Sequence, residues 1–373
     1  MMENATSEQE LLQKAVERLR SMLPTTWNVA ASNRKLTAAT GDVIQVEAMI
    51  EVTTQQQGML LFLVEARRSL EPREAEQAFS GSVRRYRALT PYPILVVAPW
   101  ISARTRELLT QERINYLDLT GNARIEVVNP ALFLSHQGAD RDPNPASRKA
   151  RVRGPRSGRL VRFLVDISPP YTVGEIASAT RLTAGYISRL LDSLDDEALI
   201  GRGRRGQVIS TDVQALLRRW TETYDVFKSN RFSSFVAPRG PADLLERIGS
   251  SVLSEQTVVT GSFAAVRLAP VAAPALLVTY ASEPDEIVQA FGLLPADRGA
   301  NVVLLRPFDE VVWERTKLDG GVRYAAPSQV AADCLTGDGR MPTEGEALVD
   351  WMTQNESAWR APSLAAAQKD GES

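Results

Sequence analysis

The feature that most constrains the fold is a stretch of about fifty residues with three helix signals in succession. Leu160–Ile167 has the apolar spacing of one helix. Thr172-Val173-Gly174-Glu175 is a capping box, in which a threonine and a glutamate three residues later satisfy the first N–H groups of a helix. A second helix is therefore predicted from Val173 to about Thr180. Thr183 caps a third, from Ala184 to about Leu194.

A hairpin signal follows the three helices. Leu199 and Ile200 begin a strand, the basic glycine-rich run Gly201–Gly206 turns, and Gln207–Ser210 returns. Three helices followed by a hairpin are typical of the winged helix-turn-helix, in which the third helix enters the major groove of DNA. We therefore predict a winged helix-turn-helix at residues 159–228 that binds double-stranded DNA, with its core motif in 159–212.

The residues expected to contact DNA come from the third helix, the hairpin and the chain before the first helix. The N-terminal half of the third helix would face base edges, whereas arginines at the hairpin tip suit phosphates or the minor groove. A run that contains no acid, including Arg156, Arg159 and Arg162, would extend the positive surface. The predicted DNA-binding residues are Thr183, Ala184, Gly185, Tyr186, Ser188, Arg189, Arg202, Arg204, Arg205, Arg148, Lys149, Arg151 and Arg153.

This stretch resembles the MarR-like and related winged-helix regulators of bacteria over about fifty residues. Winged helices also serve as protein-interaction modules, and that alternative remains open. The basic hairpin tip and the basic segment before the first helix favour DNA, because positive charge gathers there in a chain whose net charge is −2. The leading function is thus a sequence-specific transcriptional regulator with no enzymatic activity, expected to be a homodimer.

Composition excludes several other classes. A chain of 373 residues is expected to form two or three domains. Its single cysteine, Cys334, and single histidine, His136, exclude an internal disulfide and a Cys/His zinc site. No cofactor is expected. No apolar run reaches the length of a membrane span and the first residues do not read as a secretory signal, so we expect a cytoplasmic, nucleoid-associated protein.

The overall expectation is a multidomain α/β chain. Residues 1–138 read as an α/β domain, because a helix, β-rich runs and the buried strand Pro93–Ala98 follow one another. Residues 139–158 are rich in Pro, Gly, Asp and Arg and read as a basic linker. After the DNA-binding module, residues 241–360 read as a second α/β domain. Residues 361–373 read as a disordered tail.

The N-terminal domain resembles metal-dependent nucleases of the PD-(D/E)XK class, which have a restriction-endonuclease-like fold. In the resemblance, Glu47 lies on one strand, and Glu65 and Arg67 end the next. Those enzymes use acids to hold a divalent cation and a lysine to position water. Arginine here replaces lysine and cannot act as a base at neutral pH. We favour an inactive domain without metal; the alternatives are a magnesium-dependent endonuclease directed by the winged helix, or simple surface acids.

The run Tyr116–Ala123 carries a second resemblance. It is similar to a motif of the AbiEi-family antitoxins of type IV toxin–antitoxin systems and their relatives in bacteria. Those relatives join a nuclease-like domain, a winged helix and a C-terminal α/β domain in this order. The resemblance implies an antitoxin-type repressor as one form of the regulator.

In the C-terminal domain, Val258–Ala265 reads as strand, Gly-Ser turn and helix, and looks like the opening of a nucleotidyltransferase. That family needs paired carboxylates on the next strand, and Leu276–Tyr280 carries none; Glu283 and Asp285 follow it. The likeness is therefore to a degenerate member. A small-molecule pocket or a surface for a protein partner is the expected use of this domain.

Overall fold

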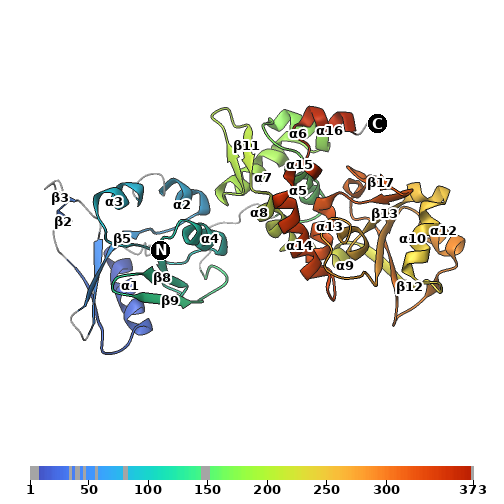
Figure 1. Ribbon diagram of the computed structural model, residues 1–373. Coiled ribbons are helices and arrows are strands. Elements are labelled where there is room, and N and C mark those ends of the chain that lie inside the picture. Colours follow the sequence, from blue (N-terminus) through green and yellow to red (C-terminus); the bar gives the residue numbers. More distant parts are fainter. Residues whose placement is uncertain are drawn as a thin grey trace, which may run out of the picture. The chain divides into compact units, whose positions relative to one another are not determined.

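The protein folds into two compact units, seen in the computed structural model of Figure 1. The structure describes residues 8–32, 36–37, 43–44, 48–54, 58–78, 83–143 and 152–370. One unit comprises Met1–Lys149 with Asp196–Ala198, and the other comprises Ala150–Asp195 with Leu199–Ser373. Each contains a seven-stranded mixed sheet, and the second also holds a two-stranded hairpin, so the fold is mixed α/β. No helix in the described residues is long and apolar enough to cross a membrane.

The first unit is organised around its sheet. The two central pairings are parallel and the outer ones antiparallel. In spatial order the strands are β1 (Asn28–Ala31), β4 (Ala48–Thr53), β5 (Met59–Ala66), β6 (Ile94–Ala98), β7 (Asn115–Asp118), β8 (Ala123–Val127) and β9 (Leu132–His136). A separate short pair joins β2 (Leu36–Thr37) to β3 (Val43–Ile44).

Helices cover both faces of this sheet, which is why its middle strands are continuously apolar. Helix α1 (Glu8–Met22) packs its apolar side, including Leu11 and Leu19, on one face with Phe62 and Leu95. The opposite face is covered from α2 (Pro72–Ala78), α3 (Arg84–Leu89) and α4 (Ala103–Gln111). The sequence predicts helix over Glu71–Leu89, and the described residues of that range are helical in α2 and α3; residues 79–82 lie outside the described part.

The second unit begins with the segment that the sequence singled out. Its second and third helices form where the sequence predicts them, whereas the first begins at Pro155, before the predicted start at Leu160. The sequence also predicts one closing helix over Asp212–Lys228, and the structure has two helices there. Asp225 caps a new helix by accepting hydrogen bonds from the N–H groups of Phe227 and Lys228. The elements are α5 (Pro155–Asp166), α6 (Val173–Thr180), α7 (Ala184–Asp196), β10 (Ile200–Arg202), β11 (Val208–Thr211), α8 (Val213–Thr221) and α9 (Val226–Ser229).

The second sheet follows. The sequence predicts strands over Gln256–Thr260, Ala275–Ala281 and Asn301–Arg306, and these correspond to the three central members β13, β14 and β16. The four outer strands were not predicted. The order is β15 (Leu294–Pro295), β12 (Arg231–Val236), β16 (Val302–Arg306), β14 (Leu277–Ala281), β13 (Thr257–Thr260), β18 (Val322–Tyr324) and β17 (Lys317–Asp319). The helices of this part are α10 (Pro241–Gly249), α11 (Ser262–Ala265), α12 (Pro284–Phe291), α13 (Pro327–Leu335), α14 (Met341–Gln354), α15 (Glu356–Trp359) and α16 (Leu364–Asp370).

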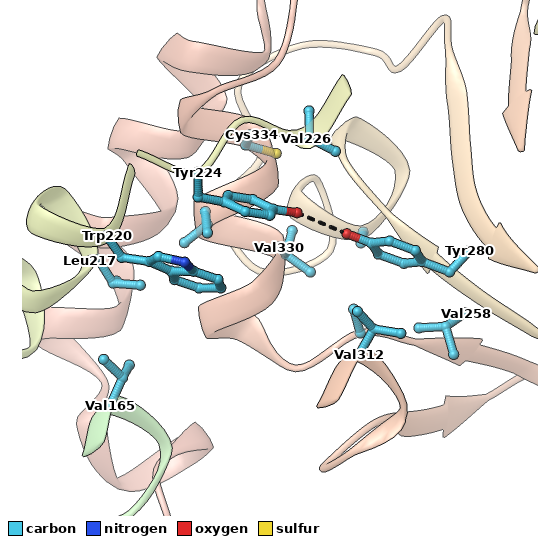
Figure 2. Close-up of a cluster of buried hydrophobic side chains, with 14 of the residues drawn as sticks. Val165, Leu217, Trp220, Tyr224, Val226, Val258, Tyr280, Val312, Val330 and Cys334 are labelled. Carbon is cyan, nitrogen blue, oxygen red and sulfur yellow. Dashed lines mark hydrogen bonds between the residues drawn. The ribbon is translucent and has the colours of Figure 1, made fainter. Parts of the chain in front are cut away.

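A single hydrophobic core joins the α5–α9 segment to this sheet. Trp220 lies on α8 and Tyr224 in the turn after it, with their ring centroids 4.8 Å apart in a tilted arrangement. The Tyr224 ring centroid lies 5.2 Å from that of Phe308. Figure 2 shows Trp220 and Tyr224 beside Val330 and Tyr280 from the C-terminal part. We predicted residues 159–228 and 241–360 as two domains; in the structure both stretches lie within the second compact unit.

A buried polar network strengthens this junction. The carboxylate of Asp333 accepts hydrogen bonds from the hydroxyls of Tyr224 (2.6 Å), Tyr280 (2.9 Å) and Thr260 (2.6 Å), and from the amide of Gln329 (2.8 Å). These groups come from different elements and all are buried. Burial raises the pKa of Asp333, with the four hydrogen bonds opposing that rise.

The C-terminal residues also differ from the disordered tail predicted for 361–373. Ala361 is buried and pairs with Ile167 at the end of α5. Leu364 and Ala367, on α16, pack against the shared core. These apolar contacts order the segment through residue 370, where sequence composition alone indicated only polarity.

Candidate nucleic-acid interface

The helical pair α6–α7 is positioned by local signals and by its core. The capping box is present: Glu175 accepts the Thr172 N–H at 2.7 Å, and Thr172 accepts the Glu175 N–H at 3.3 Å. Those bonds from Thr172 also hold the pKa of Glu175 below its usual value. Arg181 ends α6 in the left-handed region (φ +56°), which redirects the chain into α7.

The start of α7 presents a small, open surface. Thr183, Ala184 and Gly185 are exposed, and the first turn of the helix contains no acid. Arg189 is exposed one turn later, with its Nε donating to the Gly185 carbonyl at 3.2 Å, and Ser188 is half-buried. Small side chains allow close approach to a ligand surface, so four of the six predicted helix residues lie where a flat or grooved partner could reach them.

Tyr186 differs from the prediction that it reaches bases or phosphates. Its ring is half-buried and packs against the core, and its hydroxyl lies 2.8 Å from the buried Ser157 hydroxyl of α5. Ser157 in turn donates to the Arg153 carbonyl at 2.9 Å. Tyr186 therefore braces α7 against the first helix, and in this conformation its polar atom is already engaged.

The hairpin β10–β11 turns through a glycine-rich tip. The Gly203 N–H donates to Gln207 O at 2.8 Å, and Gly206 takes a positive φ of +78°, which favours glycine. Arg204 and Arg205 are exposed at the tip. Arg202, which we predicted to contact DNA, forms an ion pair with Asp192 of α7, and its Nε donates to Gly206 O at 3.1 Å.

Two arginines assigned to the positive surface are instead paired with carboxylates of the same unit. Arg162 is 1% exposed and pairs with Asp166 at 2.9 Å, while its other nitrogens reach Gln329 (2.9 Å) and two backbone carbonyls. Arg159 forms a two-pronged contact with Asp309 at 2.7 and 3.0 Å. Both were expected to extend the DNA-facing surface, but each guanidinium forms an ion pair inside the second unit, with Asp309 and Asp166 respectively.

The basic linker is described only in its last part. Arg148, Lys149 and Arg151 lie outside the described residues. Arg153 and Arg156 are exposed at the start of α5. The predicted linker ran to residue 158, but Val152 is already buried in the core. Arg181, which was not among the predicted DNA-binding residues, is also exposed, in the turn before α7.

In the first unit, the nuclease-like pattern is seen only in part. Glu65 is buried at the end of β5, and its carboxylate accepts a hydrogen bond from the Arg67 guanidinium. The two line a small hollow with apolar residues that include Leu70 and Val96. Glu47 lies outside the described residues. Within the described part, no group of three or more His, Cys, Asp or Glu side chains is placed to hold a metal ion.

The run Tyr116–Ala123 is a hydrogen-bonded turn built on Asp118, which is fully buried. Its carboxylate accepts the N–H groups of Ile101 (3.0 Å), Gly121 (2.9 Å) and Asn122 (2.9 Å), and the Asn122 side-chain amide (2.8 Å). The Asn122 side chain also accepts the Gly138 N–H at 2.8 Å. These contacts account for the signature structurally, because they fix the turn between β7 and β8.

In the Gly-Ser turn of the second unit, the groups that would contact a ligand are already in contact with other residues of the chain. Ser262 is buried and its hydroxyl donates to the buried carboxylate of Glu344. Gly261 has a φ of +63°, and a Cβ there would meet Val278 and Met341. The hydroxyl that would contact a triphosphate in a nucleotidyltransferase is thus already bonded.

Comparison of the chain with known proteins finds no relative. No family model matches the chain. No curated protein matches it. No solved structure matches it either.

Proposed function

We propose that α5–α7 and the hairpin β10–β11 form a winged helix-turn-helix, and that the protein is a sequence-specific double-stranded-DNA-binding transcriptional regulator. In this proposal α7 enters the major groove with its N-terminal half toward the bases. The hairpin is the wing. An antitoxin-type repressor is one form that such a regulator takes.

The observation that carries the proposal is the open, acid-free start of α7 beside a wing whose tip exposes Arg204 and Arg205. The first acid along α7, Asp192, is engaged by Arg202 of the wing. That ion pair fixes wing to helix and leaves the two tip arginines for phosphates. The exposed cations at the tip favour DNA over a protein partner, because DNA carries a high density of negative charge.

Three further arginines suit the DNA backbone. Arg153 and Arg156 are exposed at the start of α5, and Arg181 is exposed in the turn before α7. Contacts to phosphate position a protein without carrying sequence information. We therefore assign affinity to these residues and the wing tip, and sequence preference to Arg189 with Thr183 and Ser188.

The N-terminal unit has no catalytic step in this proposal. Of the two acids in the nuclease-like pattern, Glu65 lies in the described residues, and its carboxylate accepts a hydrogen bond from the Arg67 guanidinium. A guanidinium cannot take a proton from water at neutral pH. A metal-dependent endonuclease would need both a cation and a base at this position.

The proposal is tested by selecting binding sites for the full-length protein from a pool of random duplexes. A regulator is expected to enrich one motif and to bind it about 10³-fold or more tightly than scrambled duplex. Enrichment of no motif, together with equally weak binding of all duplexes, would show that the module does not read DNA sequence.

A further inference from the structure

The edge strand β9 of the first unit carries an inference independent of DNA binding. In the part of the chain that the structure describes, β9 pairs with β8 alone and ends the sheet. Its residues are Leu132, Phe133, Leu134, Ser135 and His136, with no lysine, proline or acid. Edge strands of monomeric proteins are normally guarded by such residues, since an open edge pairs with other chains.

The other edge of the same sheet shows what a guarded edge looks like. On β1, the Val29 carbonyl accepts a hydrogen bond of 2.6 Å from the Arg20 guanidinium. On β9, by contrast, Phe133 is 66% exposed. A groove runs along all five β9 residues, and its opposite wall is the end of α1 and the chain after it, with Met22, Leu23 and Trp27.

The backbone groups that face this groove follow from hydrogen bonding in β8. The side chain of Asn115, on β7, accepts the Glu126 N–H at 2.7 Å, so the Glu126 peptide groups face β7. Backbone direction alternates along a strand, so Ile125 faces β9, and its partner Leu134 faces β8 in return. Phe133 and Ser135 therefore present their N–H and C=O groups to the groove.

The side chains of β9 alternate between the two faces of the sheet. Leu132 and Leu134 lie on the sheet face that α1 covers and pack against its core, but both are only half-buried. A strand added beside β9 would cover them if it brought apolar residues to the same face. A strand with apolar residues at every second position would therefore satisfy both the open backbone groups of β9 and its half-buried leucines.

We propose that the occupant is β9 of a second copy, paired antiparallel about a two-fold axis through Leu134. This register overlaps all five residues. It places Phe133 opposite Ser135 of the second copy, so that the outward peptide groups satisfy one another. Leu134 then meets its own counterpart, and no charged side chain of either strand is desolvated. The result is a homodimer with one sheet continuous across both copies.

Cysteine crosslinking tests this register, because the natural Cys334 is completely buried. Residues facing each other in a non-hydrogen-bonded antiparallel pair have Cα atoms about 4.5 Å apart, within disulfide range. Leu134→Cys in the full-length protein should thus form a crosslinked dimer with oxidised glutathione. Phe133→Cys is the matched control: its counterpart would lie about 8 Å away, beyond disulfide reach.

A second variant tests the edge by sedimentation. Ser135→Pro removes an N–H that faces the groove and leaves the ladder with β8 intact, so it should give a folded monomer by circular dichroism where the wild type is a dimer. Leu318→Lys, on an exposed strand edge of the other unit, should stay dimeric. A monomeric wild type, a dimer that survives Ser135→Pro, or equal crosslinking of the Phe133→Cys and Leu134→Cys variants would each overturn the proposal.

Discussion

Removing the two exposed wing-tip charges is the perturbation whose size is easiest to work out. Arg204→Gln/Arg205→Gln removes two cations that nothing else in the described hairpin needs, since Arg202 supplies its internal contacts. If each arginine neutralises one phosphate, the slope of log K against log salt should become shallower by about 0.9 per contact, or about 1.8 in all. Between 50 and 200 mM salt, the ratio of wild-type to variant affinity should then fall about tenfold.

The assay is a salt titration of fluorescence anisotropy with a selected and a random duplex. Both duplexes should lose affinity alike, because phosphate contacts carry no sequence information. The matched control is Arg239→Gln/Arg298→Gln, which makes the same change in net charge on exposed residues of the C-terminal part. A wing variant that keeps the wild-type slope would refute the reasoning, as would a control that flattens the slope equally.

Three further predictions concern stability and metal. Tyr186→Phe loses the bond to Ser157 and should lower the free energy of unfolding by about 0.5–1.5 kcal/mol in urea titration while keeping site preference; lost preference at unchanged stability would contradict the bracing role. Chelation with EDTA should leave DNA affinity unchanged, and plasmid should remain intact with Mg²⁺ or Mn²⁺; nicking that Glu65→Gln abolishes would favour the nuclease. Burial raises the pKa of Asp333, so its contribution is complete below an ordinary carboxyl pKa of about 4 and is lost as pH rises through the raised value. The free energy of unfolding of the wild type relative to Asp333→Asn should therefore fall as pH rises. If that difference instead increased with pH, the raised pKa of Asp333 would be contradicted.

Local signals explain what the sequence could predict of the candidate interface. Thr172 and Glu175 are three residues apart, and capping depends on those residues alone, so the start of α6 could be predicted. The exposed tip of the hairpin likewise follows from adjacent glycines and arginines. Helix and strand identity was predictable wherever spacing within one element decided it.

Distant partners explain what the sequence could not predict. Arg159 and Arg162 belong to a basic run, yet their partners include Asp309 and Gln329, about 150 residues further on. A run of like charge gives no sign of such pairing, so both were assigned to the surface. The packing of Trp220 against Phe308, which lies in the C-terminal part, could not be predicted either, because it depends on tertiary contacts.

The central claim, that α7 reads DNA sequence, is tested most directly by the ratio of affinities for the selected and scrambled duplexes. Arg189→Ala should lower that ratio by about 1–3 kcal/mol, or roughly 5- to 150-fold, while binding to scrambled duplex changes little. Arg218→Ala, at a half-exposed arginine of α8 paired with Glu346, is the matched control and should keep the wild-type ratio. A ratio that Arg189→Ala leaves intact, or that both variants lower equally, would contradict the assignment of α7 as the recognition helix.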